Sequence, residues 1–199
     1  MLFRSPEDFG ISYEPIGNNS QSGKYGAIFN LKRHYGITVP RSMGVEVGAV
    51  MKAWTIAHPE TDMSHEKLMK TFTETFIEPI GEIRVREYTL SRSGTKVSGQ
   101  FTIISPEGLE QVVTGEGNGP IDAASNALKA MGYNLTVTDF QEHTRGNGSD
   151  AEAVAFVQVS NGETSAYGVG IDGNLEDAAV DALFAAANRL TQKLEGSSE

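Results

Sequence analysis

Two stretches of this sequence nearly repeat each other: Asp122-Ala123-Ala124-Ser125-Asn126-Ala127-Leu128-Lys129-Ala130 and, 55 residues later, Asp177-Ala178-Ala179-Val180-Asp181-Ala182-Leu183-Phe184-Ala185. Six of the nine positions are identical. A G-x-G sequence precedes each copy, and before it come two strand-like stretches joined by a turn of the S-x-G type. A unit of about 50 residues cannot bury both faces of its own sheet. We therefore expect the two copies to pack about a pseudo-twofold axis, with the helices on one face.

The stretch that leads into the first copy has the two-residue periodicity of antiparallel strands. Strands are predicted from Ile83 to Tyr88, from Val97 to Ile103 and from Val112, with a turn at Ser105–Gly108. Pro120 suits the first turn of a helix that ends before Gly132, and another strand is predicted over Leu135–Phe140. The expected fold class is α+β, with a small helical subdomain followed by a two-repeat, β-β-β-α-like regulatory domain.

The first 80 residues have a different texture. Residues 1–24 are rich in turn formers, and Gly17–Lys24 predicts a surface loop, while Ala27–Leu31 predicts a short strand. Apolar residues at helical spacing from Val45 to Ala57 predict a helix that stops before His58-Pro59. A second helix is predicted after Ser64, its N-cap, and ends at Pro79.

Composition narrows the functional classes. The chain has 199 residues, of which 39% are hydrophobic, and a net charge of −10 from 16 basic and 26 acidic residues. This balance disfavours nucleic acid and anionic membranes as partners, and the chain is too short for a complete eight-fold β/α barrel with a second domain. The absence of cysteine removes disulfides and thiolate metal sites. We expect a cytoplasmic protein without a signal peptide or membrane span.

Catalytic and metal motifs are weak in this sequence. The four histidines form neither H-x-H nor H-E-x-x-H, and Glu142 and His143, as neighbours in a predicted strand, would point to opposite faces. The glycine-rich run Gly115–Pro120 is more informative, because it leads from a strand directly into a helix whose first N–H groups attract a carboxylate. We expect Gly168–Leu175 to form a second such site facing the first, with apolar flanks at Ile121, Val137 and Leu175. The alternative is a tight turn without a ligand.

Three motifs carry a resemblance to a known family. Asn19-Ser20-Gln21-Ser22-Gly23-Lys24, Gly115-Glu116-Gly117-Asn118-Gly119-Pro120 and Tyr167-Gly168-Val169-Gly170-Ile171, with the closing Asn188-Arg189, occur in the order seen in the C-terminal part of 2-isopropylmalate synthase. The chain resembles that region over nearly its whole length. The resemblance implies a tail of the first accessory subdomain over residues 1–24, a hinge and helical accessory subdomain over 25–80, and a leucine-binding, dimerising regulatory domain over 82–199.

The resemblance also implies what this chain lacks and what it binds. The catalytic barrel, with its divalent metal, lies outside this sequence, so no catalytic residue, metal ligand or cofactor is expected here. The implied partners are L-leucine or a related branched-chain amino acid, a second copy of the chain, and the barrel of the intact enzyme. The residues implied to bind leucine are Gly117, Asn118, Gly119, Pro120, Ile121, Asp122, Val137, Phe140, Thr144, Ala151 and Leu175.

Several alternatives stay open at the level of sequence. Asp122 and Thr144 stand where the family often has small apolar residues. Asp122 could pair with a ligand ammonium or complement the helix dipole, and we favour the dipole because Asp177 holds the same place in the second copy. The domain could instead be a citramalate-synthase-type isoleucine sensor, a dimerisation module without a ligand or, least favoured, a stand-alone enzyme.

Overall fold

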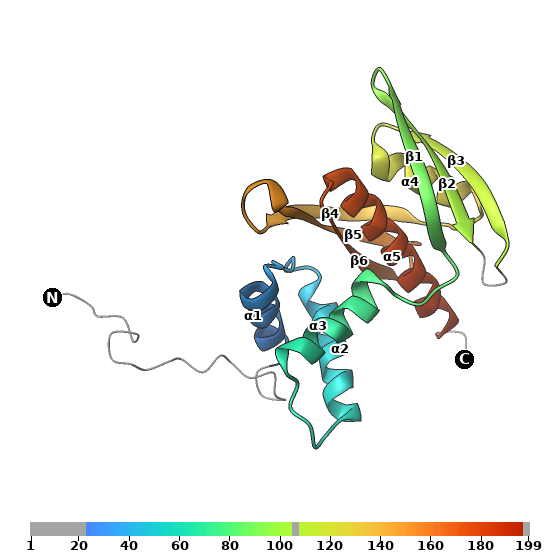
Figure 1. Cartoon of the computed structure of the whole chain (residues 1–199). Coiled ribbons are helices and arrows are strands. Elements are labelled where there is room, and N and C mark those ends of the chain that lie inside the picture. Colours follow the sequence, from blue (N-terminus) through green and yellow to red (C-terminus); the bar gives the residue numbers. More distant parts are fainter. Residues whose placement is uncertain (1–22, 105–107, 197–199) are drawn as a thin grey trace. The chain divides into compact units, whose positions relative to one another are not determined.

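The computed structural model describes residues 23–104 and 108–196, which fall into two compact units (Figure 1). The first unit ends at Met69 and the second begins at Lys70. The predicted loop over residues 17–22 and most of the predicted turn at Ser105–Gly108 lie outside the described residues. Within the described ranges, no helix combines the length and the apolar character needed to cross a membrane.

The first unit is helical. Its elements are α1 (Gly23–Tyr35), α2 (Gly44–Ala57) and the start of α3 (His65–Phe72). The strand predicted over Ala27–Leu31 is wrong, because this stretch lies inside α1 with Ala27, Asn30 and Leu31 buried at the three- and four-residue spacing of a helix face. The end of α2 before Pro59 is confirmed.

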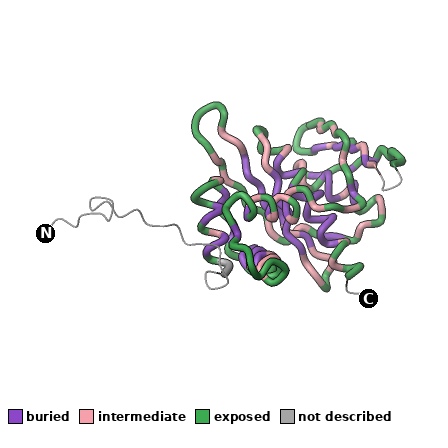
Figure 2. The backbone as a smooth tube through the Cα atoms, turned by 60° about the horizontal axis from the view of Figure 1, so that its bottom comes forward, coloured by how far each residue is buried: buried purple, intermediate pink, exposed green. Residues whose placement is uncertain are grey.

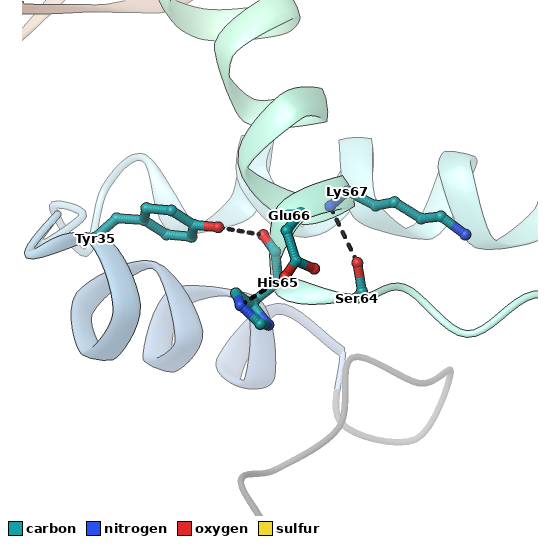
Figure 3. Close-up of polar contacts among 5 residues, drawn as sticks. All are labelled: Tyr35, Ser64, His65, Glu66 and Lys67. Carbon is teal, nitrogen blue, oxygen red and sulfur yellow. Dashed lines mark hydrogen bonds and ion pairs between the residues drawn. The ribbon is translucent and has the colours of Figure 1, made fainter.

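Polar contacts join α1 to the start of α3. The Tyr35 hydroxyl donates to the backbone oxygen of His65 at 3.0 Å, and the ring of His34 stacks on that of His65 with 4.5 Å between centroids (Figure 3). The Ser64 hydroxyl accepts the Lys67 N–H at 3.3 Å, as expected of an N-cap. The same hydroxyl, with a hydrogen bond from the backbone of Glu66, lowers the pKa of the Glu66 carboxyl. The helix start is therefore fixed by local hydrogen bonds.

The second unit contains the repeat that the sequence predicted. After the short π-helix η2 (Thr73–Ile77), its elements are β1 (Arg84–Ser93), β2 (Lys96–Ile104), β3 (Glu110–Gly117), α4 (Pro120–Ala130), β4 (Thr136–Arg145), the 3-10 turn η3 (Gly148–Asp150), β5 (Glu152–Ser160), β6 (Ser165–Asp172) and α5 (Leu175–Glu195). The two β-β-β-α repeats and the α+β class are confirmed. The strand predicted to end at Phe140 continues to Arg145, so His143 lies inside β4 and stacks on Phe156.

Each repeat forms a three-stranded antiparallel sheet, in the orders β1-β2-β3 and β4-β5-β6. Helix α4 packs on β2 and β3, and α5 packs on β5 and β6. Helix α5 also contacts the first sheet, since the rings of Phe101 on β2 and Phe184 on α5 meet edge to face with centroids 5.6 Å apart. Helix α5 therefore lies between the two sheets (Figure 1), and the buried positions, purple in Figure 2, concentrate in β5, β6 and α5.

The glycines before each helix serve the contact between strand and helix. A Cβ on Gly115 would lie 2.1 Å from the backbone oxygen of Ala123, and one on Gly170 would lie 1.9 Å from that of Ala178. Both distances are far below van der Waals contact, so only glycine allows the helix to approach this closely. Because Gly115 and Gly170 are 55 residues apart, as are Ala123 and Ala178, the repeat in the sequence is a repeat of this contact.

The segment between the two repeats of helices and sheets is fixed to α5. We call residues 76–83 the linker segment. The side chain of Asn188 accepts the Ile83 N–H at 2.9 Å and donates to the Ile83 oxygen at 2.8 Å. The Arg189 guanidinium lies 4.1 Å from the centroid of the Phe76 ring, and Gln192 donates to the backbone oxygen of Ile80. The C-terminal half of α5 thus holds the linker segment along its length.

Candidate functional site

A hollow of ≈ 420 Å³ opens beside the start of α4. It is formed by the first turn of α4, one side of that helix and the start of β4, and it is lined by Gly119, Pro120, Ile121, Asp122, Ser125, Lys129, Thr136 and Val137. Half-buried Ile121 and Val137 supply an apolar wall, while Lys129 supplies a positive charge. Five of the residues implied by the resemblance therefore meet here: Gly119, Pro120, Ile121, Asp122 and Val137.

The start of α4 leaves backbone donors open. Its N-cap residue is Gly119, which is extended (φ −162°) and has no side chain to cap the helix, and Pro120 follows without an N–H. The N–H groups of Ile121 and Asp122 have no acceptor within the helix, because they belong to its first turn. They carry the partial positive charge of a helix N-terminus, which favours a carboxylate. A Cβ on Gly119 would meet nothing within 4 Å, so the approach is unobstructed.

Asp122 has a structural partner at this turn. Its carboxylate accepts the backbone N–H of Asn118 at 2.8 Å and lies within 3.4 Å of the Asn126 amide nitrogen. An acidic residue at the third helical position that bonds back to the preceding chain is the arrangement of a capping box. The contact favours the dipole-complementing role of Asp122 over an ion pair with a ligand.

Gly117 and Asn118 are turned to other tasks. Gly117 is buried at the end of β3, where a Cβ would lie 2.5 Å from the Ala123 nitrogen, so it faces the helix and not the hollow. The Asn118 side chain accepts from the Lys96 ammonium at 3.1 Å. The expectation that both glycines of the G-x-G sequence admit a ligand is wrong, because close packing of α4 takes up that space.

The predicted second carboxylate site is closed. Gly168 and Gly170 lie within β6, against the backbone of α5. The start of α5 is capped by the Asn174 side chain, which accepts the Glu176 N–H at 2.8 Å, and Asp172 in turn accepts the Asn174 N–H at 2.8 Å. The expectation of two equivalent carboxylate sites is therefore wrong: the protein's own side chains occupy the second.

The remaining implied residues lie along β4 and beyond it. Phe140 pairs with Val157 and Thr144 with Ala153, and directly paired residues point to the same face of a sheet. Both therefore share a face with Val137, which pairs with Val159. Thr144 is seven residues from Val137, or about 23 Å along the strand at the usual rise per residue. That distance is much longer than one amino acid.

Ala151 and Leu175 belong with Thr144 at the far end of this face. Thr144 and Asp172 both pair with Ala153, Ala151 precedes that residue by two positions, and Leu175 follows Asp172 by three. Leu175 is exposed as the first residue of α5. The structure therefore divides the implied residues into a group at the α4 hollow and a group at the far end of β4, with Phe140 between them.

A larger hollow of ≈ 520 Å³ lies on the outer face of the first sheet. Its lining is formed by serine, threonine, glutamine, glutamate and glycine, including Ser98, Gln100 and Thr114. It offers no wall for an aliphatic side chain and contains none of the residues implied by the resemblance. The smaller hollow at α4 fits a branched-chain amino acid better.

Sequence reasoning did not single out two residues of the α4 hollow, Ser125 and Lys129. Both follow Ile121 on the same side of the helix, at the four-residue spacing that places residues on one face. That spacing, applied outward from Ile121, could have identified them. Lys129 is exposed, and its charge adds to the helix N-terminus in attracting a carboxylate.

The fold defines the class: an α+β domain of two β-β-β-α repeats that follows a helical segment. A family described as "LeuA allosteric (dimerisation) domain" matches residues 62–191, and the chain belongs to that family.

Curated relatives agree with this assignment. The chain is 36% identical over 193 residues to the 2-isopropylmalate synthase of Parafrankia sp. (strain EAN1pec), and the alignment covers 94% of this chain and 34% of the relative. It is 38% identical over 193 residues to that of Rhodospirillum rubrum, with the same coverage. It is 36% identical over 191 residues to that of Thermobifida fusca, covering 94% of this chain and 33% of the relative. The chain thus spans about a third of the length of these relatives.

Proposed function

We propose that this chain is the regulatory region of a 2-isopropylmalate synthase, acting in leucine biosynthesis, and that it binds L-leucine in the α4 hollow. The carboxylate of leucine accepts from the N–H groups of Ile121 and Asp122, and its side chain packs on Ile121 and Val137. Burial of an isobutyl group contributes about 1.5 to 3 kcal/mol. The observation that carries the proposal is the uncapped start of α4 at the mouth of a hollow with an apolar wall. Catalysis then belongs to the part of the enzyme outside this chain.

The division of the implied residues also supports dimerisation. Thr144, Ala151 and Leu175 cannot contact a leucine in the hollow of their own chain, because β4 separates them from it by about 23 Å. A second copy can bring its own far end to the hollow when its β4 runs antiparallel to the first. The edge of β4 is available for such an approach, since β4 pairs only with β5 among the described strands. Leucine would then stabilise the contact between two copies.

Feedback inhibition requires that leucine favour one of two states of the enzyme. Helix α5 provides a physical route, because it contacts α4 at one side and holds the linker segment through Asn188, Arg189 and Gln192. A change in the packing of α4 on α5 would be felt at the linker segment, which precedes the regulatory repeats. Hydrogen exchange of the full chain with and without leucine tests this route. Unchanged protection at Ile80 and Ile83 on leucine binding would contradict it.

The hollow itself is tested by a pair of glycine variants. Gly119→Val places a branched side chain in open space at the mouth, so we expect a folded protein whose leucine affinity is reduced at least about tenfold, from loss of one to two good contacts. Gly173→Val is the matched control, because a Cβ there also meets nothing within 4 Å but Gly173 lies before α5. Isothermal titration calorimetry with the full chain measures both.

The outcomes of this titration separate the alternatives. Equal leucine affinity of Gly119→Val and the unmodified chain would rule out the α4 hollow. Tighter binding of isoleucine than leucine would favour a citramalate-synthase-type sensor. Binding of neither amino acid by a dimeric chain would favour a dimerisation module without a ligand.

A further inference from the structure

A separate hollow of ≈ 410 Å³ lies where the linker segment, the start of β1, the end of β6 and the middle of α5 meet. Most of its lining is apolar and includes Ile77, Ile83, Ile171 and Phe184. Ile83 and Phe184 are buried and form part of the hydrophobic core, so this wall is fixed. None of the residues implied to bind leucine lines this hollow.

One carboxylate in the hollow has no partner. Asp181 projects from α5 into the lining, and among the residues that the structure describes none forms a hydrogen bond or ion pair with it. Desolvation by the surrounding protein, followed by the charges of Asp172 and Asp177, raises the pKa of Asp181 to about 6. The carboxylate is therefore mainly ionised at neutral pH and lacks a cation.

The neighbouring acids differ from Asp181 because they are engaged. Asp177 accepts from the Tyr88 hydroxyl at 2.5 Å, and Asp172 accepts the Asn174 N–H. The other charged groups of the lining are Glu78 in the linker segment and Arg84 in β1, and Arg84 pairs with neither Glu78 nor Asp181. The field at Asp181 is thus negative and uncompensated.

The geometry of the hollow is held in advance of any ligand. Asn188, which lines it, is buried and fixes Ile83 through two hydrogen bonds of 2.9 and 2.8 Å. A preformed apolar hollow with one unsatisfied charged group is the usual design of a small-molecule site, because little ordering cost opposes binding.

We propose that this hollow binds a small aliphatic amine as its ammonium ion, with the ammonium paired to Asp181 and the hydrocarbon chain against Ile77, Ile83 and Phe184. An ammonium donates strong, charge-assisted hydrogen bonds to a carboxylate. A free amino acid fits less well, since its carboxylate would lie in the negative field of Asp172 and Asp177. The site goes beyond the proposed leucine regulation and is independent of it. Because the linker segment forms one wall, a ligand here would join that segment to α5.

The test uses the full chain and isoamylamine, which is leucine without its carboxylate. We expect saturable binding of one isoamylammonium per chain by calorimetry, with NMR shift changes at Ile77, Asp181 and Phe184. Asp181→Asn removes the charge and keeps the shape, so it should weaken binding by about tenfold or more. Asp150→Asn is the control, because it removes an exposed aspartate of η3 outside the hollow and should leave the affinity unchanged.

Two further measurements make the proposal refutable. Binding should weaken as the pH falls through the pKa of Asp181, and this dependence should disappear in Asp181→Asn, whereas Glu78, Asp172 and Asp177 remain in both proteins. The Gly119→Val variant should bind isoamylamine as the unmodified chain does. Equal affinity of Asp181→Asn, or loss of amine binding in Gly119→Val, would overturn the proposal. Failure of leucine binding alone would leave it intact.

Discussion

The starts of α4 and α5 occupy equivalent places in the two repeats, yet they are completed in opposite ways. At α5, the side chain of Asn174 caps the helix, and Asp172 bonds to the residue that makes the cap. At α4, the equivalent position is Gly119, and the first-turn donors face a hollow. A repeat therefore preserved the fold twice while leaving only one helix start open. The lack of a cap, more than the presence of glycine, marks the site.

The two aspartates at the third helical position differ in the same way. Asp122 bonds back to Asn118 within its own turn, whereas Asp177 receives the Tyr88 hydroxyl from the first sheet. Burial, followed by the contact with Asp177, raises the pKa of Tyr88. The first repeat uses this position to complete a turn, and the second uses it to join α5 to β1. Helix α5 is accordingly the structural centre of the domain, and α4 is its accessible side.

The largest expected effect tests this contrast through the matched glycines. Gly170→Ala forces a Cβ into the backbone of α5, and we expect a loss of about 3 kcal/mol or more in the free energy of unfolding. Gly115→Ala should cost less, because α4 can shift toward the hollow whereas α5 is enclosed by both sheets. Urea denaturation of the two variants measures the difference. Equal losses would show that α4 is as constrained as α5.

An exchange of the caps has an intermediate effect. Asn174→Ala leaves the start of α5 uncapped and should cost about 1 kcal/mol, whereas Gly119→Asn supplies a cap to α4 and should change stability by only a few tenths. Gly119→Asn should nevertheless weaken leucine binding, since its side chain would compete for the same N–H groups. Thermal melts and leucine titrations of both variants check this pair. Unchanged leucine affinity in Gly119→Asn would contradict the role given to these donors.

The smallest effect concerns Asp181, whose counterpart in the first repeat is Asn126. The pKa of Asp181 in the folded chain, about 6, lies above the ordinary value of 3.8, because desolvation and then Asp172 and Asp177 disfavour its ionised form. Between these values the folded chain binds more protons than the unfolded chain, so stability falls as pH rises from about 4 to 6. Asp181→Asn should remove this decline and melt at a higher temperature at pH 7.

This melting comparison has a simple control. Because part of the Asp181 side chain is exposed, solvent reduces the size of the effect. Melting curves across the acidic range should converge for the two proteins at low pH and separate above pH 6. Parallel curves throughout would mean that Asp181 titrates normally.

The sequence by itself determined the paired β-β-β-α architecture, because alternation, the Pro120 start and the Gly132 stop are local signals that recur. Gly132 does adopt a positive φ of 96°, as a helix end of this kind requires. The prediction was wrong at Ala27–Leu31, where five apolar-rich residues fit a strand or a helix equally well until their neighbours decide. Local pattern also gave the first turn of α4 as a candidate for a carboxylate.

Only the tertiary structure decided what the glycines are for. Gly115, Gly117 and Gly170 face a helix backbone, whereas Gly119 faces open space, and no periodicity in the chain distinguishes the two situations. The separation of Thr144 from Val137 likewise appears only when β4 is laid out as a strand beside β5. The physical reason is the same in both cases. Local sequence selects backbone conformation, but the side on which another element packs depends on contacts between residues distant in the chain.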